Sequence, residues 1–424
     1  MKKILRDNKG SVSALVVISV LLYSIVLTTA FMQASSKRKM QMESQILAKE
    51  AYEKQLDNLD EIRDEINGGA GTKVPAEATA ETAPYFPDNT FTKKGGTIDT
   101  GLVIQDASGN EYVWVVVPRT TAVYKTTGLG KTTFTDADYT SIEKDLKDYT
   151  STYVTRDGYS DTYVADDKNV GWFADATAYN NLKNSMLKSI YENGGFYVGR
   201  YEAGIGTNRT SNIDKNSEEK YITPSTAPVT KADAYPYTYV TRTQAQNLAS
   251  NVNSGTKTSS LMFGVQWDLV LAFMSKDTAK VTDTRKLTSN STTIGNYRNS
   301  VFQLSQTGKY ATMSDWSLSS TWNQSTKPTT NFVDSSRNKI AQSSDGNGIL
   351  VTTGTSETNK VMNIYDIAGN VWKWTLEKTS NTSGPCTCRG GSFNGAGSSG
   401  PAAVRGINSP DSSSYGIGFR VSLF

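Results

Sequence analysis

The chain contains no histidine, and this absence limits the chemistry that its side chains can perform. Without histidine there is no Ser-His-Asp or Cys-His nucleophilic site and no histidine-ligated zinc or iron centre. Acid–base catalysis would fall to carboxylates, lysine or tyrosine, and no pair of carboxylates stands in a recognisable catalytic motif. The near balance of charge, a formal +3 over 424 residues, gives no indication of a nucleic-acid partner.

The chain has two cysteines, Cys386 and Cys388, which are separated by one residue. Such a pair cannot cross-link distant parts of a fold, and on a strand both side chains would project from the same face. A metal or redox role would need further ligands. The alternatives are two inert thiols or a small strained disulfide, and the core must in either case be held by packing.

Three blocks near the C-terminus carry the most specific pattern in the chain. They are Asn363–Trp374, which ends Gly-Asn-Val-Trp-Lys-Trp, then Arg389–Phe393, which reads Arg-Gly-Gly-Ser-Phe, and then Gly418–Val421, which reads Gly-Phe-Arg-Val. In this order they resemble the formylglycine-generating enzyme (FGE-sulfatase) family, which is built on a C-type-lectin-like fold. The resemblance spans roughly residues 101–424 and implies an α+β domain with long loops.

The resemblance also shows which catalytic residues are missing. In the oxidase members two cysteines follow the Arg-Gly-Gly-Ser element and bind copper, and the corresponding positions here are Gly395 and Gly400. Cys386 and Cys388 precede Arg389, so the oxidase chemistry is not carried over to them. We therefore expect a family scaffold without a cofactor and without oxidase activity. An enzyme of this family with unrecognised chemistry is the alternative.

A calcium site of the family is altered in the first block. The positions whose oxygens enclose calcium in the family fall on Asp366, Gly369, Val371 and Lys373, and the last of these is normally a glutamate. Calcium takes six to eight oxygen ligands, whereas lysine brings a cation of its own. We expect the ammonium of Lys373 to replace the metal and to pair with Asp366 and nearby carbonyls. The alternative is that Lys373 points to solvent and the site collapses.

The positions of the three blocks that match the family motifs, together with Arg405, are interpreted as structural. The arginines are expected to make buried structural interactions and the tryptophans to lie in the core. The set comprises Asp366, Gly369, Asn370, Trp372, Trp374, Arg389, Gly390, Gly391, Arg405, Gly418, Phe419 and Arg420.

The stretches 393–403 and 408–416 occupy the place of the oxidase loop. Their Asn, Ser, Gly, Ala, Asp and Tyr residues resemble the variable region of retroelement-diversified C-type-lectin proteins, and small polar residues with tyrosine suit an adaptable binding surface. A plain flexible loop without a ligand is the alternative. The candidate ligand-binding residues, expected to be exposed and close together, are Asn394, Ser398, Ser399, Ser412, Ser414 and Tyr415.

The N-terminal region predicts a membrane anchor. The stretch from Gly10 to Ser36 contains no charged residue. It is long enough to span a bilayer as a helix. Removal as a signal peptide after Thr28-Thr29-Ala30 is an alternative. Lys9-Gly10-Ser11 resembles the processing site of type IV pilin-like proteins, although Leu15 stands where pilins carry a glutamate. A pilin-like structural subunit is therefore a further possibility.

These features divide the chain into four segments. We predict a basic leader and transmembrane anchor over 1–36, a stalk helix over 37–67 capable of self-association, a linker over 68–90 and the FGE-sulfatase-like domain over 91–424. Within the domain, 101–105, 112–117 and 195–204 predict strands, and 241–251 and 264–274 predict helices. The predicted function is a single-pass, cell-surface binding or adhesion module for an unknown extracellular protein or glycan.

Overall fold

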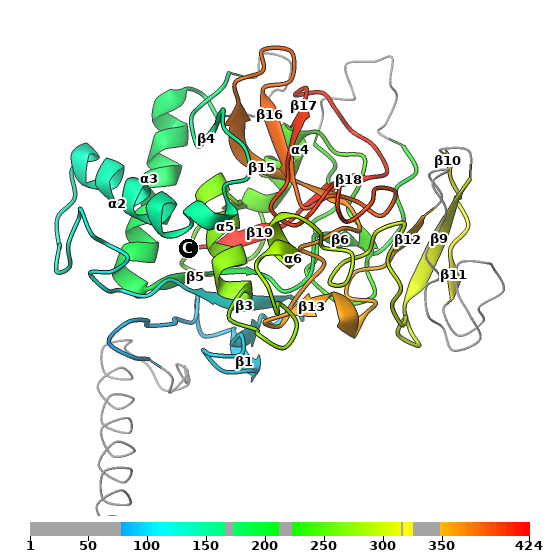
Figure 1. Ribbon diagram of the computed structural model, residues 1–424, viewed down its shortest axis with the longest axis horizontal. Coiled ribbons are helices and arrows are strands. Elements are labelled where there is room, and N and C mark those ends of the chain that lie inside the picture. Colours follow the sequence, from blue (N-terminus) through cyan, green and yellow to red (C-terminus); the bar gives the residue numbers. More distant parts are fainter. Residues whose placement is uncertain (1–77, 166–172, 212–222, 315–316, 325–347) are drawn as a thin grey trace, which may run out of the picture. The chain divides into compact units, whose positions relative to one another are not determined.

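The three C-terminal blocks become neighbours in one five-stranded sheet. The computed structural model (Figure 1) describes residues 78–165, 173–211, 223–314, 317–324 and 348–424. In it Lys373 lies opposite Arg389 and beside Gly418. The strand order is β17-β16-β15-β18, with β4 also paired to β15. The strands are β4 (Tyr159–Ser160), β15 (Trp372–Thr379), β16 (Cys386–Arg389), β17 (Arg405–Asn408) and β18 (Ile417–Phe419).

A six-stranded antiparallel sheet forms the other main layer, in the order β1-β2-β3-β5-β19-β8. Its interior strand β3 reads Glu-Tyr-Val-Trp-Val-Val, a β-branched and aromatic run that is buried after its first residue. The strands are β1 (Thr92–Gly95), β2 (Val103–Gln105), β3 (Glu111–Val116), β5 (Gly195–Gly199), β8 (Ser259–Leu261) and β19 (Val421–Leu423). The last strand of the chain thus pairs with β5 and β8 and closes the domain.

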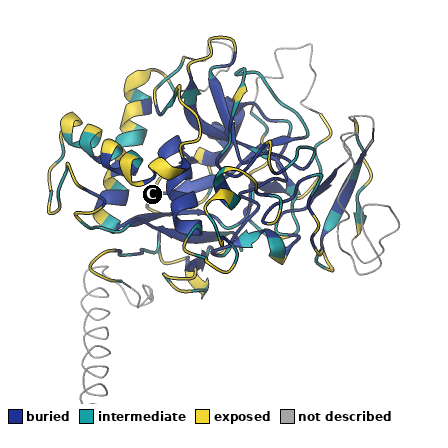
Figure 2. Cartoon of the chain, viewed as in Figure 1, coloured by how far each residue is buried: buried dark blue, intermediate teal, exposed yellow. Residues whose placement is uncertain are grey.

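Helices cover these sheets. Helix α5 (Gly264–Met274) is buried along its whole length, whereas α2 (Asp136–Tyr149) and α3 (Ala176–Asn193) expose one side (Figure 2). Thr135 and Asp138 form a capping box that begins α2, and Thr241 and Gln244 form another that begins α4 (Arg242–Ser250). A short helix, α6 (Arg285–Thr288), and two 3-10 turns, Ser151–Tyr153 and Glu357–Asn359, complete the described helical elements.

Smaller sheets lie beside the main layers. Strand β9 pairs with β10, β11 and β12, and two further pairs join β6 to β7 and β13 to β14. Their bounds are β6 (Gly204–Ile205), β7 (Tyr235–Pro236), β9 (Lys309–Ser314), β10 (Ser317–Leu318), β11 (Asn323–Gln324), β12 (Ile349–Val351), β13 (Lys360–Val361) and β14 (Ile364–Tyr365). The mixture of helices and largely antiparallel sheets is the predicted α+β class.

The predicted strands and helices of the domain are present. β2 and β5 fall within predicted strand segments, and β3 overlaps the predicted 112–117 but begins one residue earlier. α4 and α5 match the predicted helices, with Thr241 as the N-cap of α4. Helices α2 and α3 were not predicted. The leader, anchor and stalk predicted for residues 1–67 lie outside the described residues, and none of the helices that are described is long and apolar enough to span a bilayer.

The predicted linker reaches too far into the chain. Its last part, from residue 79, packs on the domain: Trp114 Nε1 donates to Thr82 Oγ1 at 2.8 Å, and the Thr82 hydroxyl donates to the Gly194 carbonyl at 3.0 Å. The Tyr85 ring lies edge-on to Trp114, with centroids 5.4 Å apart. Proline and alanine content suggested a free connection, but a buried indole N–H requires an acceptor, and this segment provides it.

Candidate functional site

Lys373, which the family resemblance assigns to a calcium-site position, has its side chain fully buried. Its Nζ donates to the Gly369 carbonyl at 2.6 Å and lies 3.3 Å from Glu202 Oε2, and neither the Lys373 nor the Glu202 side chain is exposed. The prediction that Lys373 is turned inward onto carbonyl groups is therefore correct. The arrangement does not fit calcium, because an ammonium already holds the oxygen that the metal would use.

The acidic partner of Lys373 differs from the predicted one. Asp366 Oδ2 accepts a hydrogen bond from the Gly354 amide at 2.9 Å, while the ion pair of Lys373 is with Glu202. Glu202 follows β5 and reaches the ammonium with a longer side chain. Glu202 lies in the segment 195–204 that was predicted as a strand, but its link to Lys373 depends on tertiary contact.

Asn370 ties three separate segments together next to this ion pair. Its Nδ2 donates to Glu202 Oε1 and, at 3.1 Å, to the Val351 carbonyl. Its Oδ1 accepts from Asn296 Nδ2 at 2.9 Å and from the Val351 amide at 3.1 Å. All four hydrogen-bonding positions of the amide are used, in a fully buried side chain. Its left-handed backbone, with φ of 58°, is thereby fixed by contacts on every side.

Four charged groups are buried around this point. Arg420 donates through Nη1 to the Gly199 carbonyl at 2.6 Å and through Nη2 to the Tyr365 carbonyl. Burial raises the pKa of Glu202 to about 7, although the charge of Lys373 lowers it, and burial lowers the pKa of Lys373 to about 8 against the attraction of Glu202. Burial also raises the pKa of Asp366 and lowers that of Arg420 to about 10.

A second group of four buried charges underlies the Arg-Gly-Gly element. Arg389 donates to Asp268 at 2.6 Å and to Glu377 at 2.9 Å, and Arg405 donates to the same two carboxylates at 2.6 and 2.8 Å. The predicted buried ion pair of Arg389 is confirmed, and Arg405 shares it. The two carboxylates were not identified from the sequence, because Asp268 looks like any polar residue within an apolar helix.

The copper chemistry of the oxidase members does not fit this chain. A Cβ at Gly400 would lie 3.1 Å from Gly391 Cα, a close contact that a side chain there could make only if the neighbouring backbone moved by a few tenths of an ångström. Cys386 and Cys388 are buried on β16 and form no disulfide, and Asn408 Nδ2 donates to Cys388 Sγ at 2.8 Å. Burial raises the pKa of Cys388, which opposes formation of a thiolate. Within the described residues there is no cluster of three or more metal-binding side chains.

The six predicted ligand-binding residues differ in exposure. Ser398 and Ser399 are exposed on a turn whose Gly397 bonds to Ser291 and Asn299. The other four, which are Asn394, Ser412, Ser414 and Tyr415, are partly buried. The expectation that all six are exposed is therefore wrong for these four.

Tyr415 shows why. Its ring packs on the buried Phe393 with centroids 6.0 Å apart. Burial raises the pKa of the Tyr415 phenol, and a hydrogen bond with the Asn394 side chain partly opposes this rise. Asn394 and Tyr415 are thus brought together, as predicted, but Tyr415 also contributes to packing. A polar composition does not reveal that the loop rests on an aromatic residue of its own.

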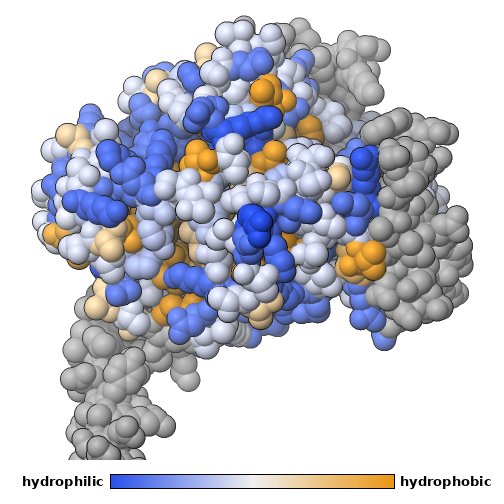
Figure 3. Space-filling model, in the orientation of Figure 1, coloured by the Kyte–Doolittle hydropathy of each residue, from blue (hydrophilic) through white to orange (hydrophobic). Residues whose placement is uncertain are grey.

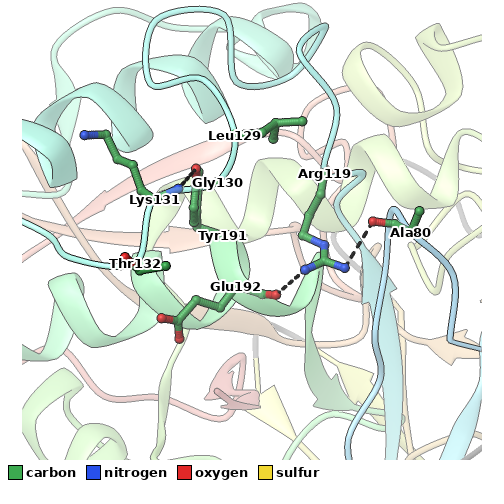
Figure 4. Close-up of a pocket in the computed structure, with 8 residues that line it drawn as sticks. All are labelled: Ala80, Arg119, Leu129, Gly130, Lys131, Thr132, Tyr191 and Glu192. Atoms are coloured by element: carbon green, nitrogen blue, oxygen red, sulfur yellow. Dashed lines mark hydrogen bonds between the residues drawn. The ribbon is translucent and has the colours of Figure 1, made fainter. Parts of the chain in front are cut away.

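A hollow elsewhere on the domain serves the fold. It has a volume of about 430 Å³ and includes Arg119, whose guanidinium donates to the Glu192 carbonyl at 2.7 Å and to the Ala80 carbonyl at 3.0 Å (Figure 4). Arg119 therefore binds the last turn of α3 to the segment before β1. Lys131, on the same hollow, pairs with Asp138 at 2.6 Å. None of the predicted site residues lines this hollow.

The raised pKa of Glu202 predicts a pH-dependent contribution to stability. The pKa of the Glu202 carboxyl rises from 4.5 to about 7 on folding. Its contribution to the free energy of unfolding is therefore fully present below pH 4.5 and is lost as the pH rises through 7. Relative to Glu202→Gln, the unsubstituted protein should lose roughly 3 kcal/mol across that window, at about 1.4 kcal/mol per pKa unit. Urea unfolding at a series of pH values measures the difference. Glu81→Gln, at an exposed glutamate, is the control, and a difference for Glu202→Gln that stays constant with pH would contradict the assignment.

Comparison with known proteins agrees with the geometry. The model of the sulfatase-modifying factor enzyme 1-like (FGE-sulfatase) domain matches residues 88–423. No curated protein sequence matches the chain. Among solved structures, Treponema denticola variable protein 1 aligns with 13% identity over 54% of this chain and 95% of that chain, and its TM-score of 0.14 is too low to show a shared fold. Because the family match spans most of its length, the chain belongs to the sulfatase-modifying factor enzyme 1-like family.

Proposed function

We propose that this protein is a membrane-anchored, extracytoplasmic binding module in which the family scaffold carries a recognition surface in place of an oxidase site. The observation that carries the proposal is the pair Gly395 and Gly400 at the oxidase cysteine positions, on loops of small polar residues. A scaffold kept without its reactive thiols retains the capacity to present loops on a rigid frame.

The frame and the loops differ sharply in burial. Arg389, Gly390, Gly391, Phe419 and Arg420 are buried, and the two arginines make charged or carbonyl contacts that fix the strands. The loops between these elements carry the partly or fully exposed polar residues. This separation supports a function in which loop side chains contact a ligand and the elements below maintain their positions.

The visible surface also supports recognition by mixed rather than purely apolar contacts. In the view of Figure 3, apolar side chains are scattered among polar ones and do not form one large patch. Among residues 390–417 the charged side chains are Arg405 and Asp411. Arg405 is buried in ion pairs with Asp268 and Glu377. Tyrosine, serine, asparagine and glycine supply such surfaces with contact area and adaptable hydrogen bonds.

The anchor belongs to the same proposal. The uncharged stretch from Gly10 to Ser36 would hold the protein in the membrane, with the C-terminal domain on the outer side. The ligand would then be an extracellular protein or glycan. Stalk residues 37–67 would hold the domain away from the bilayer.

A screen against arrays of extracellular proteins and glycans tests the binding function. We expect saturable binding, and we expect it to be lost in the double variant Ser398→Arg/Ser399→Arg because two bulky charges are added to exposed positions. The melting temperature should change little, as at other exposed sites. Thr133→Arg, at an exposed position outside the loops, is the matched control. Copper-dependent oxidation of a cysteine peptide by the protein would instead establish an enzyme.

Membrane attachment has a separate test. The full chain should sediment with membranes and need detergent for extraction, whereas a chain that begins at residue 78 should remain soluble and folded. Replacing Val17 and Leu21 by Asp should release part of the full chain, since a charge within a membrane span is unfavourable by about 3 kcal/mol. Recovery of the unprocessed full chain in the soluble fraction without detergent would refute the anchor.

A further inference from the structure

Tyr239 has a backbone conformation that is unusual for a large side chain. Its φ is 55°, in the left-handed region that glycine and asparagine visit far more readily. It precedes α4 by only a few residues and is partly buried. A bulky residue persists in this region only when its surroundings fix it there, and such positions are concentrated at functional sites.

Contacts on both sides impose the conformation. Arg209 donates through Nε to the Thr238 carbonyl and through Nη2 to the Tyr239 carbonyl, each at 3.0 Å. On the other side the Tyr239 amide donates to the Ser414 carbonyl at 3.1 Å. The guanidinium carbon of Arg209 also lies 5.6 Å from the centre of the Tyr237 ring. Tyr239 is thus bonded directly to the loop that carries Ser412, Ser414 and Tyr415.

This contact brings Tyr239 close to Tyr415. Burial raises the pKa of the Tyr239 phenol, and the neighbouring Tyr415 raises it further. Tyr415 is in turn held by Phe393 beneath it and by the side chain of Asn394. Two phenols and an amide therefore share one part of the surface, although Tyr239 is far from the other two in sequence.

The chemistry of this part of the surface is that of neutral donors and acceptors. Phenol and serine hydroxyls donate and accept, the Asn394 amide does both, and the aromatic faces offer apolar area. Asp411 accepts from Ser409 Oγ at 2.7 Å, and two donors of Arg209 are used on backbone carbonyls. An anionic ligand would find no matching cation among residues 390–404 and 406–417, which contain neither lysine nor arginine.

We propose that Tyr239 is a fixed member of the recognition surface and that Tyr239, Tyr415 and Asn394 together contact a neutral carbohydrate. The inference rests on the proposed binding function and specifies its ligand class. A sugar ring presents an apolar C–H face to aromatic rings and hydroxyls that both donate and accept, which matches these three side chains. The strained backbone of Tyr239 is retained because it places the phenol at the loops.

The left-handed backbone of Tyr239 makes a separate prediction for stability. At an ordinary position glycine is less stable than alanine, because it loses more conformational freedom on folding. At a left-handed position the order reverses, since alanine keeps the steric strain and glycine removes it. The pair Tyr239→Gly and Tyr239→Ala loses the same ring, so their comparison isolates the backbone.

The test uses the full-length chain in detergent, an array of neutral oligosaccharides, and parallel arrays of acidic oligosaccharides and extracellular proteins. We expect Tyr239→Gly to melt above Tyr239→Ala. Both should bind the neutral oligosaccharides at least tenfold more weakly than the unsubstituted chain, as should Tyr415→Ala. Tyr149→Ala, at an exposed tyrosine on α2, should bind normally.

Each contrary result has a distinct meaning. If Tyr239→Gly melts below Tyr239→Ala, the backbone is not strained and the inference fails. If Tyr415→Ala loses binding while both Tyr239 variants retain it, Tyr239 lies outside the site and the proposed binding function stands. Binding only to acidic oligosaccharides or to proteins overturns the ligand class. No binding by the unsubstituted chain to any array overturns the proposed function itself.

Discussion

The rest of the domain depends on the buried contacts of the Lys373 ammonium group. This group bonds to the Gly369 carbonyl and pairs with Glu202, within a motif that the family resemblance assigns to a calcium site. Removing one member of a buried ion pair typically costs about 3–5 kcal/mol, because the other charge is left without a partner. Asn370, which bonds to Glu202, extends this effect to Val351 and Asn296, so one cation organises four separated segments.

The second charged cluster holds together the strands from which the loops of the proposed surface leave. Arg389 and Arg405 share Asp268 and Glu377, so β16, β17, β15 and α5 are joined by one network. The loops that carry the proposed surface leave from the ends of β16 and β17. Both of these strands are fixed by buried charges. A rigid frame beneath the loops is what the proposed recognition function requires.

Sequence patterns predicted what depends on local periodicity or on a specific motif. Helix α5, with its uninterrupted apolar residues, and the inward-facing Lys373 belong to this class. The pairing of Lys373 with Glu202 in place of Asp366 could not be predicted, because it joins residues that are far apart in sequence and depends on tertiary structure. The sequence also gave no sign that Tyr239 reaches Ser414, since this contact follows from tertiary structure alone.

Composition does not predict packing where polar segments have buried partners. The segment around Thr82 has the proline and alanine content of a linker, yet it accepts the indole N–H of Trp114. Tyr415 stands in a serine-rich loop, yet it rests on Phe393. In both cases the deciding factor is a buried partner from a distant part of the chain, which composition does not encode.

The most direct test of the account measures calcium in the purified protein and the effect of calcium on its melting temperature. Because Lys373 fills the cation position, we predict no stoichiometric calcium by elemental analysis and no change of melting temperature with either calcium or a chelator. One equivalent of bound calcium that raises the melting temperature by several degrees, and is lost in Asp366→Asn, would contradict the claim that a buried ammonium replaces the metal.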